Sequence, residues 1–264
     1  LIREMDRAGV VVHTGCQVTP PQLKEAGYDA VLVAVGSAPA RIPVKGAERA
    51  WLAEDVFGKE KQLGHRVVVI GGADTGRDVS LYLARTGHQV TMVTRGQIQL
   101  SGDMHTERLE REAFETNPNF SYVDFAQTLE IGAHQVTLRV QTNGVRGFIP
   151  LMLPQEDEDA YYVDQHEGGP GGPGGPGGPG GPGGPFGGPG GPGGPGGGPA
   201  PEPVYETRTL DFDDVVISGG RTPRMALAEQ LRGCAPVGKI LGDTVKVSNI
   251  KHAIYSGYKA AMEL

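Results

Sequence analysis

VVVIGGADTGRDVSLYLARTGHQVTMVTR, residues 67–95, decides the fold class of this 264-residue chain. Residues 67–70 are continuously apolar, which is typical of a strand buried on both faces of a parallel sheet. Residues 75–86 place apolar side chains at helical spacing, and residues 90–94 repeat the strand pattern. A strand, a turn, a helix and a second strand in this order predict a parallel α/β fold.

The turn between the first strand and the helix carries the candidate binding residues. In chain order these are Gly71, Gly72, Ala73, Asp74, Thr75 and Gly76. Such a turn directs backbone N–H groups and a helix N-terminus at one spot, which suits a pyrophosphate. Ala73 stands where the dinucleotide fingerprint has its middle glycine, and its methyl group would push the phosphates outward. An ordinary turn without a ligand stays open as the alternative.

The end of the second strand departs from the fingerprint in another way. Thr94 and Arg95 stand where a carboxylate should hold the ribose hydroxyls. Arg95 is either a partner for a 2′-phosphate or a solvated surface charge. We therefore expect weak binding, with NADPH or a bare adenosine phosphate preferred over NADH.

Further elements follow from the same patterns. We expect strands over residues 10–13, 30–35, 136–140, 208–212 and 215–218. The alternation of residues 136–140 favours an antiparallel strand. Helices are expected over residues 1–8 and 104–116, and Ser248 is a candidate N-cap for an amphipathic closing helix.

Residues 155–203 interrupt the globular pattern. Residues 155–167 are acidic, and residues 168–199 repeat Gly-Gly-Pro with one interruption at Phe186. Neither part has enough apolar surface to offset the entropy lost on ordering, so we expect a disordered, flexible surface insertion. An ordered polyproline II element is the alternative.

Composition excludes several kinds of function. The net charge is −7 with scattered basic residues, and no apolar run is long enough to span a bilayer. We expect no nucleic-acid partner, no membrane partner and a cytoplasmic location. The two cysteines, Cys16 and Cys234, form no C-x-x-C pair, which excludes a redox dithiol and a four-thiolate iron–sulfur site within these residues. We expect both thiols to be buried, and the seven histidines show no metal-ligand spacing.

Two more glycine-marked strand ends extend the pattern. Gly36 closes the apolar run AVLVAV of residues 30–35, and Gly242 and Asp243 close a strand that precedes the last helix. A carboxylate at such a position could bind a polyol, and the helix N-terminus could face a phosphate or a ring carbonyl. Each feature alone is also common in simple turns.

Taken in order, these motifs resemble the two-dinucleotide flavoproteins, in which a nicotinamide domain is inserted into an FAD domain. VLVAVGSAPARIP, VVVIGGADTG, DDVVISGGRTPRMAL and ILGDTVKVSNIKHAI carry the resemblance. The pair ISGGRTP and LGDTVKVSNIKHAIYSGYKAAMEL is most similar to the C-terminal part of the NADH:flavin oxidoreductases. Members of this family include 2,4-dienoyl-CoA reductase and trimethylamine dehydrogenase.

The resemblance implies two Rossmann-like halves. Residues 1–58 and 219–264 would form a partial FAD-binding domain, and residues 59–218 an inserted NAD(P)- or ADP-binding domain. Gly36, Gly242 and Asp243 would lie along FAD, with Asp243 on the ribityl chain. The first FAD fingerprint and a flavin barrel with FMN and an iron–sulfur cluster are expected before Leu1, so the chain would be one segment of a longer polypeptide.

The implied function is electron transfer between a nicotinamide cofactor and FAD or FMN in a flavin-dependent oxidoreductase. In this interpretation the cofactors do the chemistry, and no residue of this chain is a convincing acid, base or nucleophile. The alternative comes from trimethylamine dehydrogenase-like members, which keep only an ADP moiety at the second site. The chain would then be a structural adenine-nucleotide module without hydride entry.

Overall fold

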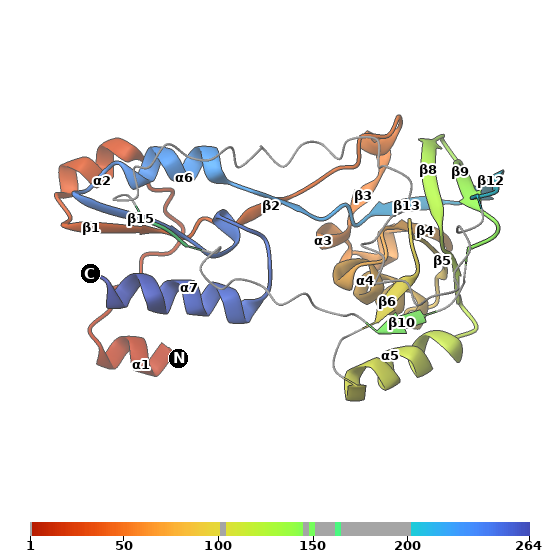
Figure 1. Cartoon of the computed structure of the whole chain (residues 1–264), viewed down its shortest axis with the longest axis horizontal. Coiled ribbons are helices and arrows are strands. Elements are labelled where there is room, and N and C mark those ends of the chain that lie inside the picture. Colours follow the sequence, from red (N-terminus) through yellow and green to blue (C-terminus); the bar gives the residue numbers. More distant parts are fainter. Residues whose placement is uncertain (1, 101–103, 145–147, 151–161, 165–201) are drawn as a thin grey trace, which may run out of the picture. The chain divides into compact units, whose positions relative to one another are not determined.

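The computed structural model describes residues 2–100, 104–144, 148–150, 162–164 and 202–264. The contacts divide the chain into two compact units, which are coloured along the sequence in Figure 1. Unit 1 comprises residues 1–38, 157–170 and 223–264, and unit 2 comprises residues 39–156 and 171–222. The Gly-Gly-Pro tract, residues 168–199, lies outside the described residues.

Unit 2 contains most of the strands. Its helices are η1 (Ala47–Arg49), α3 (Ala53–Val56), η2 (Glu60–Gln62), α4 (Asp74–Arg85) and α5 (Met104–Glu115). Its strands are β3 (Trp51–Leu52), β4 (Arg66–Ile70), β5 (Gln89–Val93), β6 (Ile98–Leu100), β7 (Phe120–Val123), β8 (Ala126–Ile131), β9 (Gln135–Gln141), β10 (Phe148–Pro150), β12 (Tyr205–Asp211) and β13 (Asp214–Ile217). The boundary between the units runs through β2 (Ser37–Pro39) and β14 (Arg221–Pro223), which pair with each other.

A five-stranded parallel sheet in the order β3-β13-β4-β5-β7 forms the centre of unit 2. Successive side chains of β4 point to opposite faces. Val67 and Val69 pack among residues of α3 and α4, whereas Val68 and Ile70 pack on the other face. The strand is continuously apolar because both of its faces are buried.

The second face of this sheet is covered by an antiparallel sheet in the order β12-β9-β8. Val136, Leu138 and Val140 alternate along β9 and are fully buried against the parallel sheet. This confirms the antiparallel strand predicted for residues 136–140. The result is a three-layer α/β/β unit, visible on the right of Figure 1.

Unit 1 is built around a parallel pair. Its elements are α1 (Ile2–Arg7), α2 (Pro20–Ala26), β1 (Ala30–Val33), β11 (Tyr162–Asp164), α6 (Met225–Arg232), β15 (Val237–Leu241), η4 (Gly242–Thr244) and α7 (Ile250–Met262). β15 lies between β1, which is parallel to it, and β11, which is antiparallel. Val33 and Ile240 pack with Ala228 and Leu231 of α6 in the core of this unit. The α/β class expected from the sequence is therefore confirmed.

Two local expectations are wrong. Residues 10–13 form no strand, and the side chains of Val10, Val11 and Val12 are exposed, because no strand lies beside them within the described residues to pair with their backbone. The N-cap of α7 is Asn249, not Ser248, because the Asn249 side chain accepts the hydrogen bond from the backbone N–H of His252.

Two other expectations about unit 1 also need correction. Cys234 is buried as expected, but Cys16 is exposed, since it follows the same segment that lacks a pairing strand. Residues 162–164 were expected within a disordered insertion, yet they form β11. Their backbone finds a partner in β15, with Tyr162 opposite Leu241.

Candidate functional site

The predicted turn lies at the carboxyl end of β4, where the order of the strands in the sheet changes direction. β5 follows β4 in sequence and lies on one side of it, whereas β13 returns on the other side. In open parallel sheets, ligands bind in the crevice outside the carboxyl ends of the strands at such a switch point. The fold therefore places Gly71–Gly76 at the position where a dinucleotide would lie.

Two of the three fingerprint positions need glycine for the fold itself. Gly71 has φ +117°, and a Cβ there would lie 2.2 Å from the carbonyl oxygen of Ser218. A Cβ on Gly76 would lie 2.0 Å from the carbonyl oxygen of Gly71. The missing Cβ atoms thus let the first turn of α4 approach both β4 and β13 closely.

Gly72 and Thr94 are brought together across the ends of β4 and β5. A Cβ on Gly72 would lie 2.8 Å from both Cβ and Oγ1 of Thr94. The neighbouring Arg95 is exposed and makes no hydrogen bond or ion pair within the described part of the chain. Its guanidinium is available to an anion on the β5 side of the turn.

Ala73 is the N-cap residue of α4. It is exposed, with φ −78° and ψ 178°, a conformation that any L-residue adopts, and it supplies no capping side chain. The first N–H groups of α4, including those of Thr75 and Gly76, therefore have no side-chain acceptor at the cap. An anion at this point would complete their hydrogen bonding and be favoured by the helix dipole.

Asp74 brings a negative charge into the first turn of α4, and a buried cation moderates it. The Arg77 guanidinium, 4% exposed, donates from Nη2 to Asp74 Oδ1 at 2.9 Å and lies 3.5 Å from Glu110 Oε1. Burial raises the pKa of the nearby Asp78, with further upward contributions from Asp74 and Glu110 and a downward one from Arg77. The Asp74–Arg77 ion pair reduces the repulsion that a phosphate would meet at the helix start.

Unit 1 brings together the other predicted residues. β1 and β15 are parallel, so Gly36 and Gly242 follow at the same edge of the sheet. The N–H of Gly36 donates to Thr244 Oγ1 at 2.7 Å, and the N–H of Gly242 donates to Ser256 Oγ at 3.1 Å. Asp243 accepts from the N–H of Ser248 at 3.2 Å and keeps its carboxylate partly exposed.

The fit to a flavin rests on the open space at this edge. A Cβ added to Gly36 would meet nothing within 4 Å. Asp243 offers acceptor oxygens for hydroxyl groups, and α7 begins a few residues later. The hydroxyls of Thr244 and Ser256, which hold the two glycine turns, were missed by sequence reasoning. The only available signal was their position on either side of the helix start.

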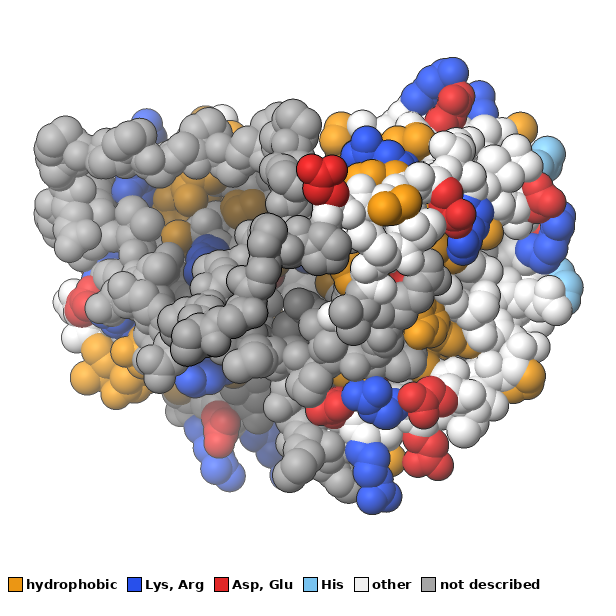
Figure 2. All heavy atoms as spheres, turned by 45° about the vertical axis from the view of Figure 1, so that its right-hand side comes forward, with side chains coloured by type: hydrophobic (Ala, Val, Ile, Leu, Met, Phe, Trp, Pro, Cys, Tyr) orange, Lys and Arg blue, Asp and Glu red, His pale blue; other side chains and the backbone are white. Residues whose placement is uncertain are grey.

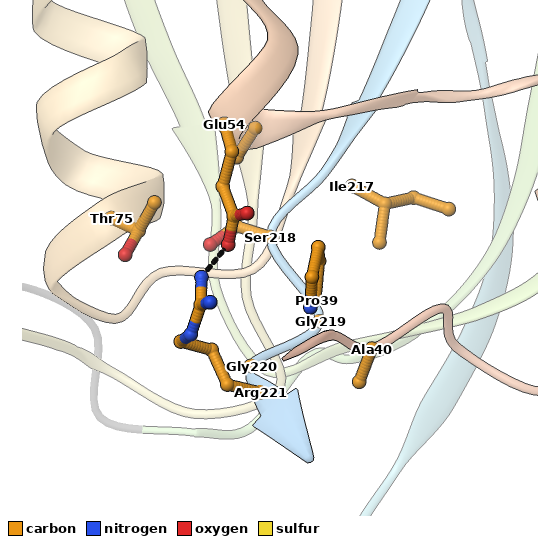
Figure 3. Close-up of a pocket in the computed structure, with 10 residues that line it drawn as sticks. Pro39, Ala40, Glu54, Thr75, Ile217, Ser218, Gly219, Gly220 and Arg221 are labelled. Carbon is orange, nitrogen blue, oxygen red and sulfur yellow. Dashed lines mark hydrogen bonds and ion pairs between the residues drawn. The ribbon is translucent and has the colours of Figure 1, made fainter. Parts of the chain in front are cut away.

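A pocket in unit 2 also escaped sequence reasoning. It lies beside Thr75 in the first turn of α4 and is lined by residues of three other segments, among them Glu54 and Arg221 (Figure 3). Both side chains come from segments that the sequence presents as ordinary surface positions. Their juxtaposition follows from the pairing of β3 with β13.

Some kinds of site are not found. Within the described ranges, no group of His, Cys, Asp and Glu side chains is arranged to hold a metal ion. None of the helices that the structure describes is both long and apolar enough to cross a membrane. In the view of Figure 2, the basic and acidic side chains of the described residues lie interspersed over the surface.

A parallel sheet with a glycine turn and an uncapped helix at its switch point is typical of dinucleotide-binding α/β folds. Residues 3–140, about half of the chain, match the pyridine nucleotide-disulphide oxidoreductase family. The chain belongs to this family.

Individual relatives agree with the family assignment. The chain is 36% identical to cinnamate reductase of Clostridium sporogenes over 256 residues, which is 97% of this chain and 30% of the reductase. It is 38% identical to NADH oxidase of Thermoanaerobacter brockii over 100 residues, 34% of this chain and 15% of the oxidase. The chain thus spans less than a third of the length of either relative.

The fold is also similar to a solved structure. 2-Naphthoyl-CoA reductase superposes with a TM-score of 0.68 at 18% identity, covering 100% of this chain and 31% of the reductase. At this identity the similarity shows the fold alone.

Proposed function

We propose that this chain is the dinucleotide- and flavin-binding portion of a flavin-dependent oxidoreductase. Unit 2 binds a nicotinamide dinucleotide at Gly71–Gly76, and Gly36, Gly242 and Asp243 of unit 1 contact FAD. The observation that carries the proposal is the uncapped N-terminus of α4 at the switch point of a parallel sheet. When bound, the nicotinamide supplies a hydride and the flavin accepts it.

The residues of this chain bind and orient in this proposal. The N–H groups of α4 hold the pyrophosphate, and Arg95 holds an anion on the β5 side. Asp243 accepts hydroxyl hydrogen bonds in unit 1. The two cysteines form no disulfide, so the proposal does not include disulphide chemistry by this chain despite the family's name.

The length of the relatives supports a role within a larger protein. Cinnamate reductase is similar to this chain over only 30% of its own length. We propose that a flavin barrel domain precedes these residues in the same polypeptide and passes electrons to or from them. The substrate of the whole protein would be determined there, and the cytoplasm would be its location.

Ala73→Leu tests the dinucleotide site without disturbing the fold. Ala73 is exposed in an extended conformation, so leucine should fit the backbone, but its side chain would fill the space in front of the N–H groups. A hydrogen bond to a charged group contributes about 1.5–3 kcal/mol, so losing one should weaken binding about tenfold or more. Titration calorimetry with NADH, NADPH and ADP measures this.

Ala226→Leu is the matched control, since Ala226 is an exposed alanine in the first turn of α6 in unit 1. We expect it to leave all three affinities unchanged and both variants to melt like the unchanged protein. If Ala73→Leu binds all three nucleotides as tightly as the unchanged chain, the site is not at α4.

A second function is favoured by two features, the Ala73 methyl group and the absence of a carboxylate directly after β5. The chain would then hold an adenine nucleotide as a structural element without hydride entry. Anaerobic addition of NADH or NADPH to the FAD-reconstituted protein separates the two. Bleaching of the flavin absorbance supports electron transfer, and tight ADP binding without bleaching supports the structural role.

A further inference from the structure

The pocket of unit 2 lies on the β13 side of the glycine turn. Residues 218–221 leave β13 and line it together with Pro39, Glu54 and Thr75. Figure 3 shows the Glu54 and Arg221 side chains pointing toward each other across it, with Thr75 of α4 nearby. A ligand whose phosphates lie at α4 would therefore extend one of its own two ends toward this pocket.

The sheet topology indicates which end of the dinucleotide lies toward the pocket. Thr94 and Arg95 follow β5 on one side of β4, whereas Arg221 follows β13 on the other side. A dinucleotide lies across the switch point, with one nucleoside on each side of the pyrophosphate. If the adenosine lies on the β5 side, where the proposed function has Arg95 hold an anion, the nicotinamide half lies toward the pocket with Glu54 and Arg221.

The backbone holds Arg221 at the edge of this pocket. A Cβ on Gly219 would lie 2.4 Å from the carbonyl oxygen of Ala40, so this turn packs tightly against the neighbouring segment. The N–H of Ala40 donates to the carbonyl oxygen of Gly220 at 2.9 Å. The side chain beyond this fixed turn forms an ion pair with Glu54.

The ion pair between Glu54 and Arg221 is partly exposed, so a ligand can also bind the arginine. The Arg221 and Glu54 side chains are 36% and 38% exposed, and pairs of this exposure stabilise a fold only weakly. An arginine has five N–H donors in a fixed fork, so Arg221 can bind a ligand oxygen as well as the carboxylate. Glu54 without Arg221 would place an uncompensated negative charge next to the site for an anionic ligand.

We propose that Glu54 and Arg221 form a charge-balanced latch over the nicotinamide half of the dinucleotide site. This inference rests on the proposed function and adds a specificity device to it. Arg221 neutralises Glu54 and contacts the cofactor, and Glu54 limits affinity by holding part of the arginine. The latch acts on a full dinucleotide and not on ADP, which ends before the pocket.

The two single substitutions should change NADH affinity in opposite directions. Glu54→Gln removes the ion pair between Glu54 and Arg221 and should tighten NADH binding about two- to fivefold, the range of a partly exposed charge pair. Arg221→Gln exposes the Glu54 carboxylate and should weaken NADH binding by a similar factor. Arg221→Lys keeps the charge and should retain most of the affinity. The difference should shrink as salt increases, because the charges are partly exposed.

The experiment is titration calorimetry of the full chain and these variants with NADH and with ADP, at low and high salt. Glu206→Gln and Arg208→Gln are the controls, because this ion pair on β12 has a similar exposure, 45% for Glu206 and 39% for Arg208, and lies outside the pocket. We expect no change in either affinity for them. ADP affinity should be unchanged in every variant.

Each other outcome has a defined meaning. If both single substitutions weaken NADH, the pair has a structural role and the latch is refuted. If ADP shifts as much as NADH, the residues act on the phosphates and the nicotinamide assignment is wrong. If NADH and ADP bind nowhere on the unchanged chain, the proposed function fails and this inference fails with it.

Discussion

Gly76→Ala should destabilise unit 2 although it places a better helix former inside a helix. Alanine is favoured over glycine in a helix by about 1 kcal/mol. The added Cβ, however, would lie 2.0 Å from the carbonyl oxygen of Gly71, which is backbone and has little freedom to move. Overpacking of this kind costs about 1–3 kcal/mol and occasionally more. The clash therefore offsets the gain in helix propensity, and we expect a net loss of up to about 2 kcal/mol.

Trp51 makes the measurement specific. It is the only tryptophan of the chain, and its Nε1 donates to Asp214 Oδ1 at 3.1 Å in unit 2. Urea unfolding followed by its fluorescence thus reports on the unit that contains Gly76. A lower midpoint with an unchanged slope would show a loss of stability.

Gly257→Ala is the matched comparison. Gly257 lies within α7 of unit 1, and a Cβ there would meet nothing within 4 Å. This variant should be stabilised by about 0.5–1 kcal/mol, as measured by circular dichroism of the whole chain. If Gly76→Ala is stabilised as Gly257→Ala is, the close approach of α4 to Gly71 does not govern the turn and our reasoning is refuted.

Three more predictions concern charged residues. Arg95→Glu should weaken NADPH binding more than NADH binding in calorimetry, because Arg95 is exposed, free of protein partners among the described residues and on the β5 side; equal weakening would make it a general phosphate contact. Burial raises the pKa of Asp78, so its contribution to stability is present at low pH and is lost as pH rises through the raised pKa. Asp78→Asn should therefore raise the urea midpoint at pH 7, and the gain should vanish on acidification. Hydrogen bonds from Arg66 lower the pKa of Asp213, so Asp213→Asn should lower the midpoint at pH 7, with a gap that narrows as pH falls through the lowered pKa.

The sequence predicts the centre of unit 2 well because its signals are local. The four apolar residues 67–70, which are followed by Gly71, predict β4. Helical spacing predicts α4 within a residue of its observed bounds. A strand buried on both faces needs only its own composition to be recognised. The same holds for β9, whose alternation follows from having one buried and one exposed face.

Prediction fails where an element depends on a partner. Residues 10–13 have the composition of a strand, but a strand also needs a neighbour for its N–H and C=O groups. Residues 162–164 show the opposite case. Their acidic surroundings predict no strand, but this short segment pairs with β15. Pairing over long sequence separations leaves no mark in either local pattern.

The candidate site likewise contains residues that the local sequence predicts and residues that it does not. The glycines of the turn are readable because a missing side chain is a strong local signal. Glu54 and Arg221 are 167 positions apart, and only the pairing of β3 with β13 brings them together. Nothing in the local sequence around either residue distinguishes it from a surface charge.

Ala73 shows how the needs of the fold and of a ligand can be separated. At Gly71 and Gly76 a side chain would collide with backbone, so these glycines would be required even if no nucleotide ever bound. Ala73 has an ordinary extended conformation and an exposed side chain, so the fold places no demand on that position. A glycine there would serve only the approach of a ligand. The alanine therefore reduces contact with a phosphate without cost to the fold, and for this reason substitutions of Ala73 should change nucleotide binding and leave the stability of unit 2 unchanged.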